Sequence, residues 1–286
     1  MKHHASRARD VLMTALAPIS WGTTYIVTTE FLPPEHPLLV ASMRALPIGL
    51  LLTIGLRKLP QGIWWIRMLI LGGLNISVFQ ALLFVAAYRL PGGVAATTGA
   101  IQPLLVALFA WAILNQKPSK LSVVAAITGF IGVGLLVLGP DAQLDTIGIM
   151  AALGGAGAMG LGTVLVKRWH PPVSLMVFTA WQLAIGGAML LPVALVTEGR
   201  FEAVTRTNLW GFIYLGIIGT GLAYALWFRG IDRLSPSAAS YLGLLSPVVA
   251  TLIGYVFLQE TLATVQMLGI AVVLISVVVG QQADSE

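Results

Sequence analysis

Residues 71–114 read LGGLNISVFQALLFVAAYRLPGGVAATTGAIQPLLVALFAWAIL, two apolar runs separated by the turn RLPGG. Each run approaches the length of about 20 residues that an α-helix needs to span a bilayer. The rest of the chain has the same character, since 57% of its 286 residues are hydrophobic and only 9% are charged. An ordinary soluble domain contains about 25% charged residues. The sequence therefore predicts an all-α polytopic membrane protein.

Ten apolar segments of spanning length are separated by short connections such as PPEHP and NQKPSK. We expect helices at roughly 11–31, 38–56, 65–87, 93–114, 120–139, 147–166, 173–196, 208–227, 236–258 and 263–280. The first segment follows the basic start MKHHASRARD, but it is of spanning length and lacks an A-x-A-like cleavage site. It is interpreted as a retained helix, and the short connections leave no room for a soluble domain.

Basic residues are distributed unevenly between the two sets of connections. In the predicted topology, twelve of them lie on the side of the N-terminus: Lys2, Arg7, Arg9, Arg57, Lys58, Arg67, Lys117, Lys120, Lys167, Arg168, Arg229 and Arg233. Three lie on the other side: Arg89, Arg200 and Arg206. Lys and Arg accumulate in short cytoplasmic loops. We therefore expect a multi-pass protein of a cell membrane, in bacteria the inner membrane, with both termini cytoplasmic.

The chain contains an internal repeat. A shift of 144 residues aligns 71–114 with 215–258 and pairs Gly72 with Gly216, Arg89 with Arg233 and Pro103 with Pro247. Each repeat holds five predicted helices, an odd number, so the second must be inserted upside down. The predicted units are residues 1–140 and 141–286. Inverted repeats are typical of secondary transporters, which bind their substrate near the bilayer midplane between the halves.

The motifs and their order resemble EamA-type drug/metabolite transporters over essentially the whole chain. The resemblance rests on SWGTTY (20–25), Arg44 in the second helix, the R-L-x-x-x-x-A turn before the fourth and ninth helices, their prolines, and LQET (258–261). It implies a ten-helix exporter of small metabolites, including amino acids, or of drugs. One departure is that Glu260 closes the ninth helix whereas Gln116 closes the fourth.

Several other functions lack the residues they require. The chain has no cysteine, and its four histidines have no metal-binding spacing, so no metal or cofactor is expected. No P-loop, nucleophile triad or carboxylate cluster is present, so neither ATP-driven transport nor an enzyme is expected. The basic charge fits membrane orientation better than nucleic-acid binding. Two alternatives stay open: a membrane enzyme on lipid substrates, and a non-transporting receptor or assembly subunit.

Arg44 is a charged residue inside an apolar run, some two turns below the predicted outer surface. A charge near the bilayer centre costs roughly 2.5–3.5 kcal/mol on insertion scales. Arg44 could reach the outer headgroups, or it could cap a carbonyl or pair with Glu30 or Glu260. Alternatively, it faces a cavity and binds a substrate carboxylate.

Uncharged polar and aromatic side chains inside the predicted helices are further candidates for substrate contacts, with interhelical hydrogen bonds or ordinary packing as the alternative. With Arg44, the predicted substrate-binding set is Trp21, Tyr25, Gln80, Gln102, Trp181, Gln182, Tyr224 and Tyr241. Gln80 aligns with Tyr224 in the repeat and is expected to face the same central region.

Two further groups could serve movement and coupling. Pro103 and Pro247 occupy equivalent positions about ten residues into their predicted helices, where each would form a kink or hinge. Glu30 and Glu260 are either solvated interface residues or proton-coupling carboxylates. The sequence thus predicts a secondary transporter that exports a small organic solute by alternating access, proton-coupled or exchange-driven, as a monomer or homodimer.

Overall fold

The computed structural model describes residues 2–33, 35–89, 98–137, 145–201, 203–257 and 262–283, and these residues contain helices and no strands. In the first half, the helices are α1 (Lys2–Phe31), α2 (Pro37–Leu56), α3 (Trp64–Gly72), α4 (Phe79–Arg89), α6 (Gln102–Leu114) and α7 (Lys120–Val137). A π-helix, η1 (Gly73–Val78), joins α3 to α4 in one continuous rod.

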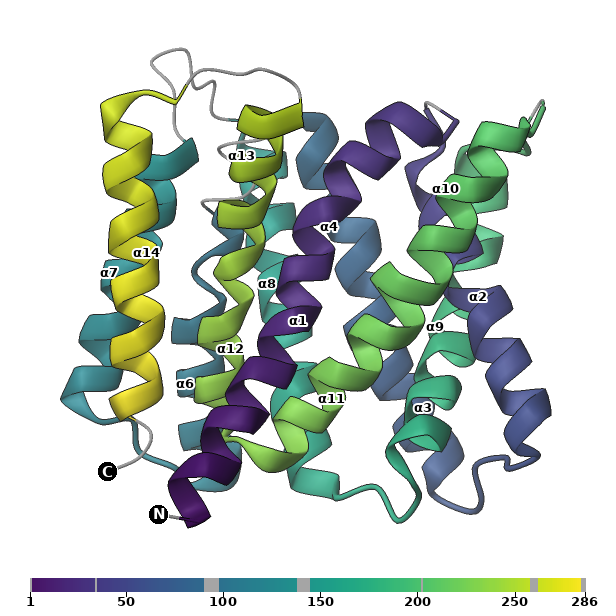
Figure 1. Cartoon of the computed structure of the whole chain (residues 1–286). Coiled ribbons are helices and arrows are strands. Elements are labelled where there is room, and N and C mark those ends of the chain that lie inside the picture. Colours follow the sequence, from purple (N-terminus) through teal and green to yellow (C-terminus); the bar gives the residue numbers. More distant parts are fainter. Residues whose placement is uncertain are drawn as a thin grey trace.

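The second half contains a similar series of helices. Its helices are α8 (Thr146–Trp169), α9 (Leu175–Thr197), α10 (Arg206–Gly216), α11 (Ala223–Arg233), α12 (Pro236–Gly243), α13 (Leu245–Phe257) and α14 (Thr264–Ala283). The π-helix η2 (Ile217–Leu222) joins α10 to α11. The helices stand side by side as one layered bundle, and both termini lie at the same end (Figure 1).

Eight helical segments of the described chain are long and apolar enough to cross a membrane. Two shorter apolar helices, Gln102–Leu114 and Lys120–Leu136, accompany them. Of the segment expected at 93–114, residues 93–97 lie outside the described residues, 98–99 are helical, 100–101 form a turn, and α6 begins at Gln102. An all-helical membrane protein is therefore confirmed, whereas the count of ten spanning helices stays a prediction.

The positions of the prolines differ from the prediction of kinks within continuous helices. Pro103 lies in the first turn of α6, and Pro247 is the third residue of α13, which begins directly after α12 has ended at Gly243. Proline has no N–H to donate to the carbonyl four residues earlier, so a helix readily starts at proline but does not easily pass through it. The chain breaks its helix before each proline.

Helices α2 and α9 pack closely because small residues line their contact. A Cβ at Gly49 of α2 would lie 2.6 Å from the backbone carbon of Leu183, and one at Gly187 of α9 would lie 2.7 Å from the Leu46 nitrogen. Ser42 Oγ donates to the Gly187 carbonyl at 3.0 Å in the same interface. At the end of this pair, the Glu198 carboxylate accepts from the N–H groups of Leu38 and Leu39, both at 2.8 Å. These contacts fix α2, which carries Arg44, against α9.

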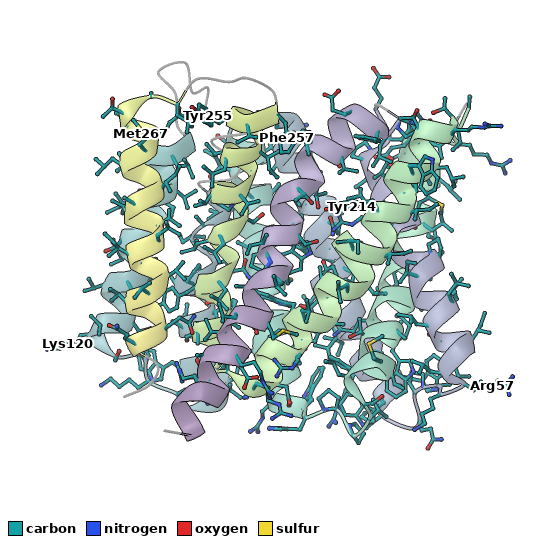
Figure 2. All side chains as sticks on the ribbon, viewed as in Figure 1. Arg57, Lys120, Tyr214, Tyr255, Phe257 and Met267 are labelled. Atoms are coloured by element: carbon teal, nitrogen blue, oxygen red, sulfur yellow. The ribbon has the colours of Figure 1, made fainter. Side chains whose placement is uncertain are left out.

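The surface of the bundle is apolar over most of its height. Large side chains such as Leu12, Ile54 and Val196 are 69%, 70% and 87% exposed. A soluble protein does not expose so much apolar surface, whereas lipid chains cover it without cost. Arg57 and Lys120 lie at the end that carries both termini, and Tyr255, Phe257 and Met267 lie at the other (Figure 2).

Candidate functional site

The two π-helices mark equivalent places in the two halves. Residue 73 plus 144 is residue 217, and residue 78 plus 144 is residue 222, so η1 and η2 coincide under the shift that aligns the sequence repeat. A π-helix is rare and is found frequently at functional sites. Both lie in the middle of long helices, so each places irregular backbone deep within the bundle.

A cluster of buried polar side chains gathers beside η1. We call it the central cluster, and its members come from five elements of both halves: Arg44 (α2), Asn75 (η1), Gln80 (α4), Gln182 (α9) and Tyr224 (α11). Their exposed fractions are 7%, 0%, 3%, 0% and 1%. Such groups are costly in an apolar bundle unless they bind one another or a ligand.

The members of the central cluster contact one another directly. Asn75 Nδ2 donates to Gln182 Oε1 at 2.8 Å, and Tyr224 Oη donates to the Asn75 carbonyl at 3.4 Å. The Tyr224 hydroxyl also interacts with the side chains of Gln80 and Arg44. Tyr224 thus connects the second half to three polar residues of the first.

Backbone carbonyls of both π-helices take part in this region. Trp21 Nε1 donates to the Gly219 carbonyl of η2 at 3.2 Å, as Tyr224 does to the Asn75 carbonyl of η1. A π-helix shifts its backbone hydrogen bonds by one residue. These carbonyls accept from aromatic side chains of neighbouring helices, so the π-helices help to orient Trp21 and Tyr224.

Aromatic rings form one wall of the central cluster. The Trp21 ring centroid lies 5.3 Å from that of Tyr224 and 5.2 Å from that of Trp227. Phe228 continues the wall, with centroids 5.7 Å from Tyr224 and 5.3 Å from Phe178. Tilted pairs at these separations are favourable, and they place apolar faces next to the polar groups.

Several polar atoms around the central cluster are buried and have no hydrogen-bond partner in the described protein. They are Asn75 Oδ1, Gln182 Nε2, Thr220 Oγ1 and Trp227 Nε1. Leaving such an atom unsatisfied costs about 1–3 kcal/mol, and most buried polar atoms in proteins are paired. These unpaired atoms include hydrogen-bond donors and an acceptor. They suit a solute, or waters, with both donor and acceptor groups.

Arg44 and Asp10 are the charged residues buried within the described chain. Asp10 pairs with Arg229 at the end of the bundle that carries the termini, so Arg44 alone brings charge to the central cluster. Arg44 is 7% exposed and lies near Tyr224, so its side chain is held inside the bundle. A buried cation favours an anionic group near it.

The structure brings Trp21, Arg44, Gln80, Gln182 and Tyr224 of the predicted set together. Trp181 packs in the same apolar core but donates its Nε1 to the Lys58 carbonyl at 2.7 Å, toward the helix ends. Gln102 is half-buried at the start of α6. The Tyr25 side chain and Glu260 lie outside the described residues, and Glu30 is exposed at the end of α1.

Tyr241 lies in a second apolar core, apart from Tyr224. Its hydroxyl is 2.8 Å from Ser122 Oγ of α7, and its ring fills the space beside Gly280 of α14. Two polar residues of this region are absent from the predicted set, Asn75 of the central cluster and Thr220 of η2. Asn75 is an uncharged polar residue inside an apolar run, and that pattern could have indicated it, whereas Thr220 carries no comparable signal.

Glycines of α8 provide the space for this arrangement. A Cβ at Gly162 would overlap the Asn75 side chain, and a Cβ at Gly154 would lie 3.1 Å from Leu82. These two glycines of α8 therefore allow close packing against η1 and α4. A larger residue at Gly162 would displace Asn75 from the central cluster.

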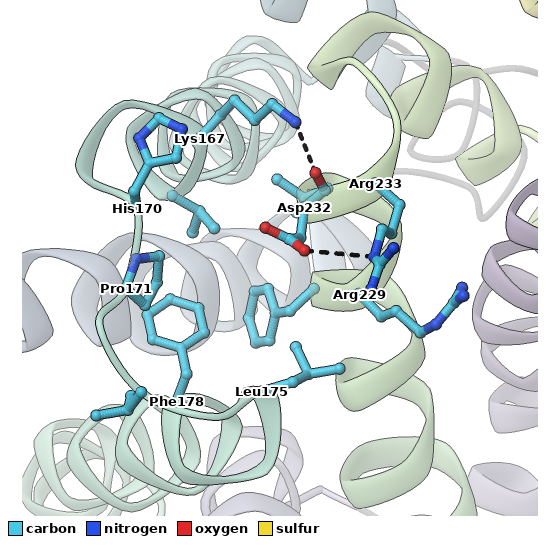
Figure 3. Close-up of a pocket in the computed structure, with 12 residues that line it drawn as sticks. Lys167, His170, Pro171, Leu175, Phe178, Arg229, Asp232 and Arg233 are labelled. Carbon is cyan, nitrogen blue, oxygen red and sulfur yellow. Dashed lines mark hydrogen bonds and ion pairs between the residues drawn. The ribbon is translucent and has the colours of Figure 1, made fainter.

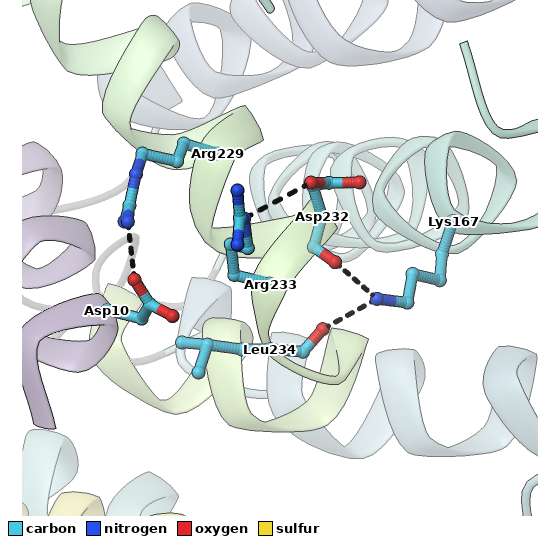
Figure 4. A network of polar contacts seen from close by, with 6 residues as sticks. All are labelled: Asp10, Lys167, Arg229, Asp232, Arg233 and Leu234. Carbon is cyan, nitrogen blue, oxygen red and sulfur yellow. Dashed lines mark hydrogen bonds and ion pairs between the residues drawn. The ribbon is translucent and has the colours of Figure 1, made fainter. Parts of the chain in front are cut away.

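A second polar network closes the end that carries the termini. Arg229 of α11 pairs with Asp10 of α1, and Lys167 of α8 donates to the carbonyls of Asp232 and Leu234 at 2.8 and 3.0 Å (Figure 4). Its residues come from both halves. The sequence predicted the basic charges of this end but not their partners.

Comparison with known proteins agrees with this architecture. The EamA-like transporter family matches residues 9–138 and 146–279. The chain is 46% identical over 267 residues to Protein PecM of Dickeya dadantii (strain 3937), covering 93% of this chain and 90% of PecM. It is 29% identical over 268 residues to the uncharacterized inner membrane transporter YedA of Escherichia coli (strain K12), covering 91% of this chain and 86% of YedA.

A solved crystal structure shares the fold, with a TM-score of 0.80, 19% sequence identity, and coverage of 95% of this chain and 98% of that one. The two family matches together span nearly the whole chain, as the predicted resemblance requires. The chain belongs to the EamA-like transporter family.

Proposed function

We propose that this protein is a secondary transporter that exports a small organic solute across the cytoplasmic membrane by alternating access. The observation that carries the proposal is the central cluster, in which side chains of both halves surround a buried cation beside two π-helices. Secondary transporters bind substrates at such a place, where irregular helices of two repeats meet. Membership of a family of membrane transporters supports the same conclusion.

Helix packing supports an arrangement of two inverted repeats, residues 1–140 and 141–286. Helix α1 packs on α11 and α13, and α8 packs on α4 and α6 in the equivalent way. The pairs α2 with α9 and α7 with α14 join equivalent helices of the two halves. This reciprocal pattern is expected of halves related by a two-fold axis.

The directions of α1 and α8 support inversion. Asp10, near the start of α1, and Lys167, near the end of α8, both bind the last turns of α11. Equivalent helices of the two halves therefore run in opposite directions. The proposal takes the two shorter apolar helices, together with the eight candidate spans, as transmembrane helices, ten in all.

The distribution of charge supports cytoplasmic termini. Arg57 and Lys120 lie at the end that carries both termini (Figure 2), and Lys167, Arg229 and Arg233 form the network there. Basic residues accumulate on the cytoplasmic side. The inner end is therefore the one closed by the Asp10–Arg229 pair.

The chemistry of the central cluster favours an amphipathic solute with a carboxylate, such as an amino acid or a drug-like acid. Arg44 supplies the charge, Gln80 and Tyr224 supply hydrogen bonds, and Trp21 and Trp227 supply apolar faces.

Pro103 and Pro247 are proposed hinges, because each directly follows a break in its helix. Coupling to protons through Glu30 or Glu260, or exchange of solutes, remains part of the proposal.

Flux from proteoliposomes tests the proposal. A panel of labelled amino acids, organic acids and cationic drugs is followed with and without an imposed pH gradient. Saturable flux of an acid-bearing solute supports a carrier, and acceleration by the gradient supports proton coupling. Absence of flux for every solute would contradict the carrier function and favour a non-transporting membrane subunit.

A further inference from the structure

A pocket of about 430 Å³ opens at the inner end of the bundle, apart from the central cluster. We call it the basic pocket. Its charged lining includes Lys167, Arg229, Asp232 and Arg233, and its aromatic lining consists of Phe178 and Phe228 (Figure 3). The volume lies within the range of about 300–1,000 Å³ that is usual for small-molecule sites.

Positive charge predominates in the basic pocket. Three cations line it, against the carboxylate of Asp232 in its wall and that of Asp10 behind Arg229. Lys167 is held in place by the carbonyls of Asp232 and Leu234 at 2.8 and 3.0 Å. A fixed ammonium at the wall of a pocket with low-dielectric surfaces attracts anions.

The two arginines differ in what they offer a ligand. Arg229 binds Asp10 through Nη2 and its Nη1 is buried, so Arg229 contributes positive charge to the pocket rather than an accessible donor at Nη1. Arg233 is 3.7 Å from Asp232, and both side chains are largely exposed, at 60% and 68%. An exposed pair of this kind is weak, so Arg233 can turn to a bound anion at little cost.

Aromatic rings separate the basic pocket from the central cluster. Phe178 and Phe228 pack edge to face with centroids 5.3 Å apart, and Phe228 lies 5.7 Å from Tyr224 on its other side. A solute in the pocket would therefore rest its apolar part on the barrier that closes the path toward Arg44.

We propose that the basic pocket is a binding site for organic anions with an aromatic or apolar body, which a solute occupies before it reaches the central cluster. As an entry site it rests on the proposed transport function. The anionic group binds Arg233 in the field of the Arg229 charge, and the apolar body packs on Phe178 and Phe228. The headgroup of an anionic lipid offers the same charge, so the experiment must distinguish a dissolved anion from a lipid.

The test is equilibrium dialysis of radiolabelled 2-naphthoate against the protein in phosphatidylcholine nanodiscs, with uncharged 2-naphthamide as the matched probe. Arg233→Gln is expected to weaken 2-naphthoate binding about fivefold, the upper range for an exposed charge interaction, and to leave 2-naphthamide unaffected. Arg168→Gln is the control, because Arg168 is an exposed cation of the same inner end that does not line the pocket. It is expected to change binding less than twofold.

Phe178→Leu gives an independent measurement. It removes an aromatic face but no charge, so it is expected to weaken 2-naphthoate binding while binding of inorganic phosphate is unchanged. Equal effects of Arg233→Gln and Arg168→Gln, or binding lost through Arg44→Gln alone, would overturn the assignment.

A second arm adds phosphatidylglycerol to the nanodiscs. Binding that does not depend on this lipid supports a dissolved anion, and displacement by it would overturn the entry role. The assay measures binding without transport. A failure of flux in proteoliposomes would therefore contradict the proposed function while the Arg233-dependent binding still stands.

Discussion

Tyr224 and Tyr241 are both fully buried tyrosines of the second half, but they serve different purposes. The Tyr224 hydroxyl meets Arg44, Gln80 and the Asn75 carbonyl, whereas the Tyr241 hydroxyl binds Ser122 within a separate apolar core. We expect Tyr224→Phe to reduce solute flux about fivefold or more, because the hydroxyl orients the only cation of the central cluster. Flux from proteoliposomes measures this effect.

Tyr241→Phe is the matched control. Loss of its hydroxyl leaves Ser122 without that partner, so we expect a loss of about 1–2 kcal/mol in stability and nearly unchanged flux. Thermal unfolding in detergent measures the first quantity. Equal flux defects in the two variants would show that the division between the two cores is wrong.

Individual residues were predictable to the extent that the repeat constrained them. Gln80 and Tyr224 were predicted to face the same central region because they align at the shift of 144, and both side chains are buried in the central cluster. Tyr241 met the same criterion of an internal aromatic residue, yet it packs against α7 and α14. The sequence shows how polar a residue is and to which helix it belongs. Which neighbour its side chain faces depends on tertiary packing.

At the scale of elements, the close contact of α2 with α9 holds Arg44 in place. A Cβ at Gly49 would overlap the Ala184 nitrogen and lie 2.6 Å from the Leu183 carbon, and backbone atoms cannot give way as side chains can. We expect Gly49→Ala to destabilise the protein by about 1–3 kcal/mol or more, as overpacking does. The midpoint of thermal unfolding in detergent reports it.

Gly55→Ala provides the comparison within the same helix. Nothing lies within 4 Å of a Cβ at Gly55, so we expect no loss and a gain of up to about 1 kcal/mol from helix propensity. Similar losses in both variants would argue against a tight α2–α9 contact.

The helices themselves follow from their composition, but their irregularities do not. Apolar runs of spanning length predicted most elements within a few residues. The two π-helices were not predicted, because GLNISV and IIGTGL share no residue pattern that shifts a hydrogen bond. The breaks before Pro103 and Pro247 follow from the missing N–H of proline, although the sequence suggested only a kink there.

At the scale of the whole molecule, the Asp10–Arg229 pair joins the two halves at the end of the bundle that carries both termini. If the halves rock about the central cluster, opening toward the cytoplasm must break this pair. We expect Asp10→Asn to open the inner end more often. The chain has no cysteine, so a single Thr220→Cys can report access to η2.

The measurement is the rate at which a membrane-impermeant thiol reagent, added from the cytoplasmic side, labels Thr220→Cys. Asp10→Asn is expected to raise this rate several-fold. Asp232→Asn is the control. Asp232 pairs with Arg233 of the same helix, so this pair does not connect the two halves. An unchanged labelling rate with Asp10→Asn would show that the Asp10–Arg229 pair does not control access to η2.

The contacts that join the halves could not be derived from the sequence. Inverted halves were expected from the odd number of helices in each repeat, but Asp10 of α1 and Arg229 of α11 are 219 residues apart and their pairing needs the fold. Nothing in the sequence around Asp10 or Arg229 indicates that they pair. Only the packing of α1 on α11 brings them together.

The central claim is that Arg44 carries the charge of the transport site, and flux of an acid-bearing solute in proteoliposomes tests it most directly. Arg44→Gln is compared with wild type and with Arg57→Gln, which removes the same charge from an exposed position at the end that carries the termini. We predict a loss of about tenfold or more for Arg44→Gln, as for a buried charge that loses its partner. For Arg57→Gln we predict a change within about twofold. Saturable flux that survives Arg44→Gln would contradict the account and return Arg44 to a structural role.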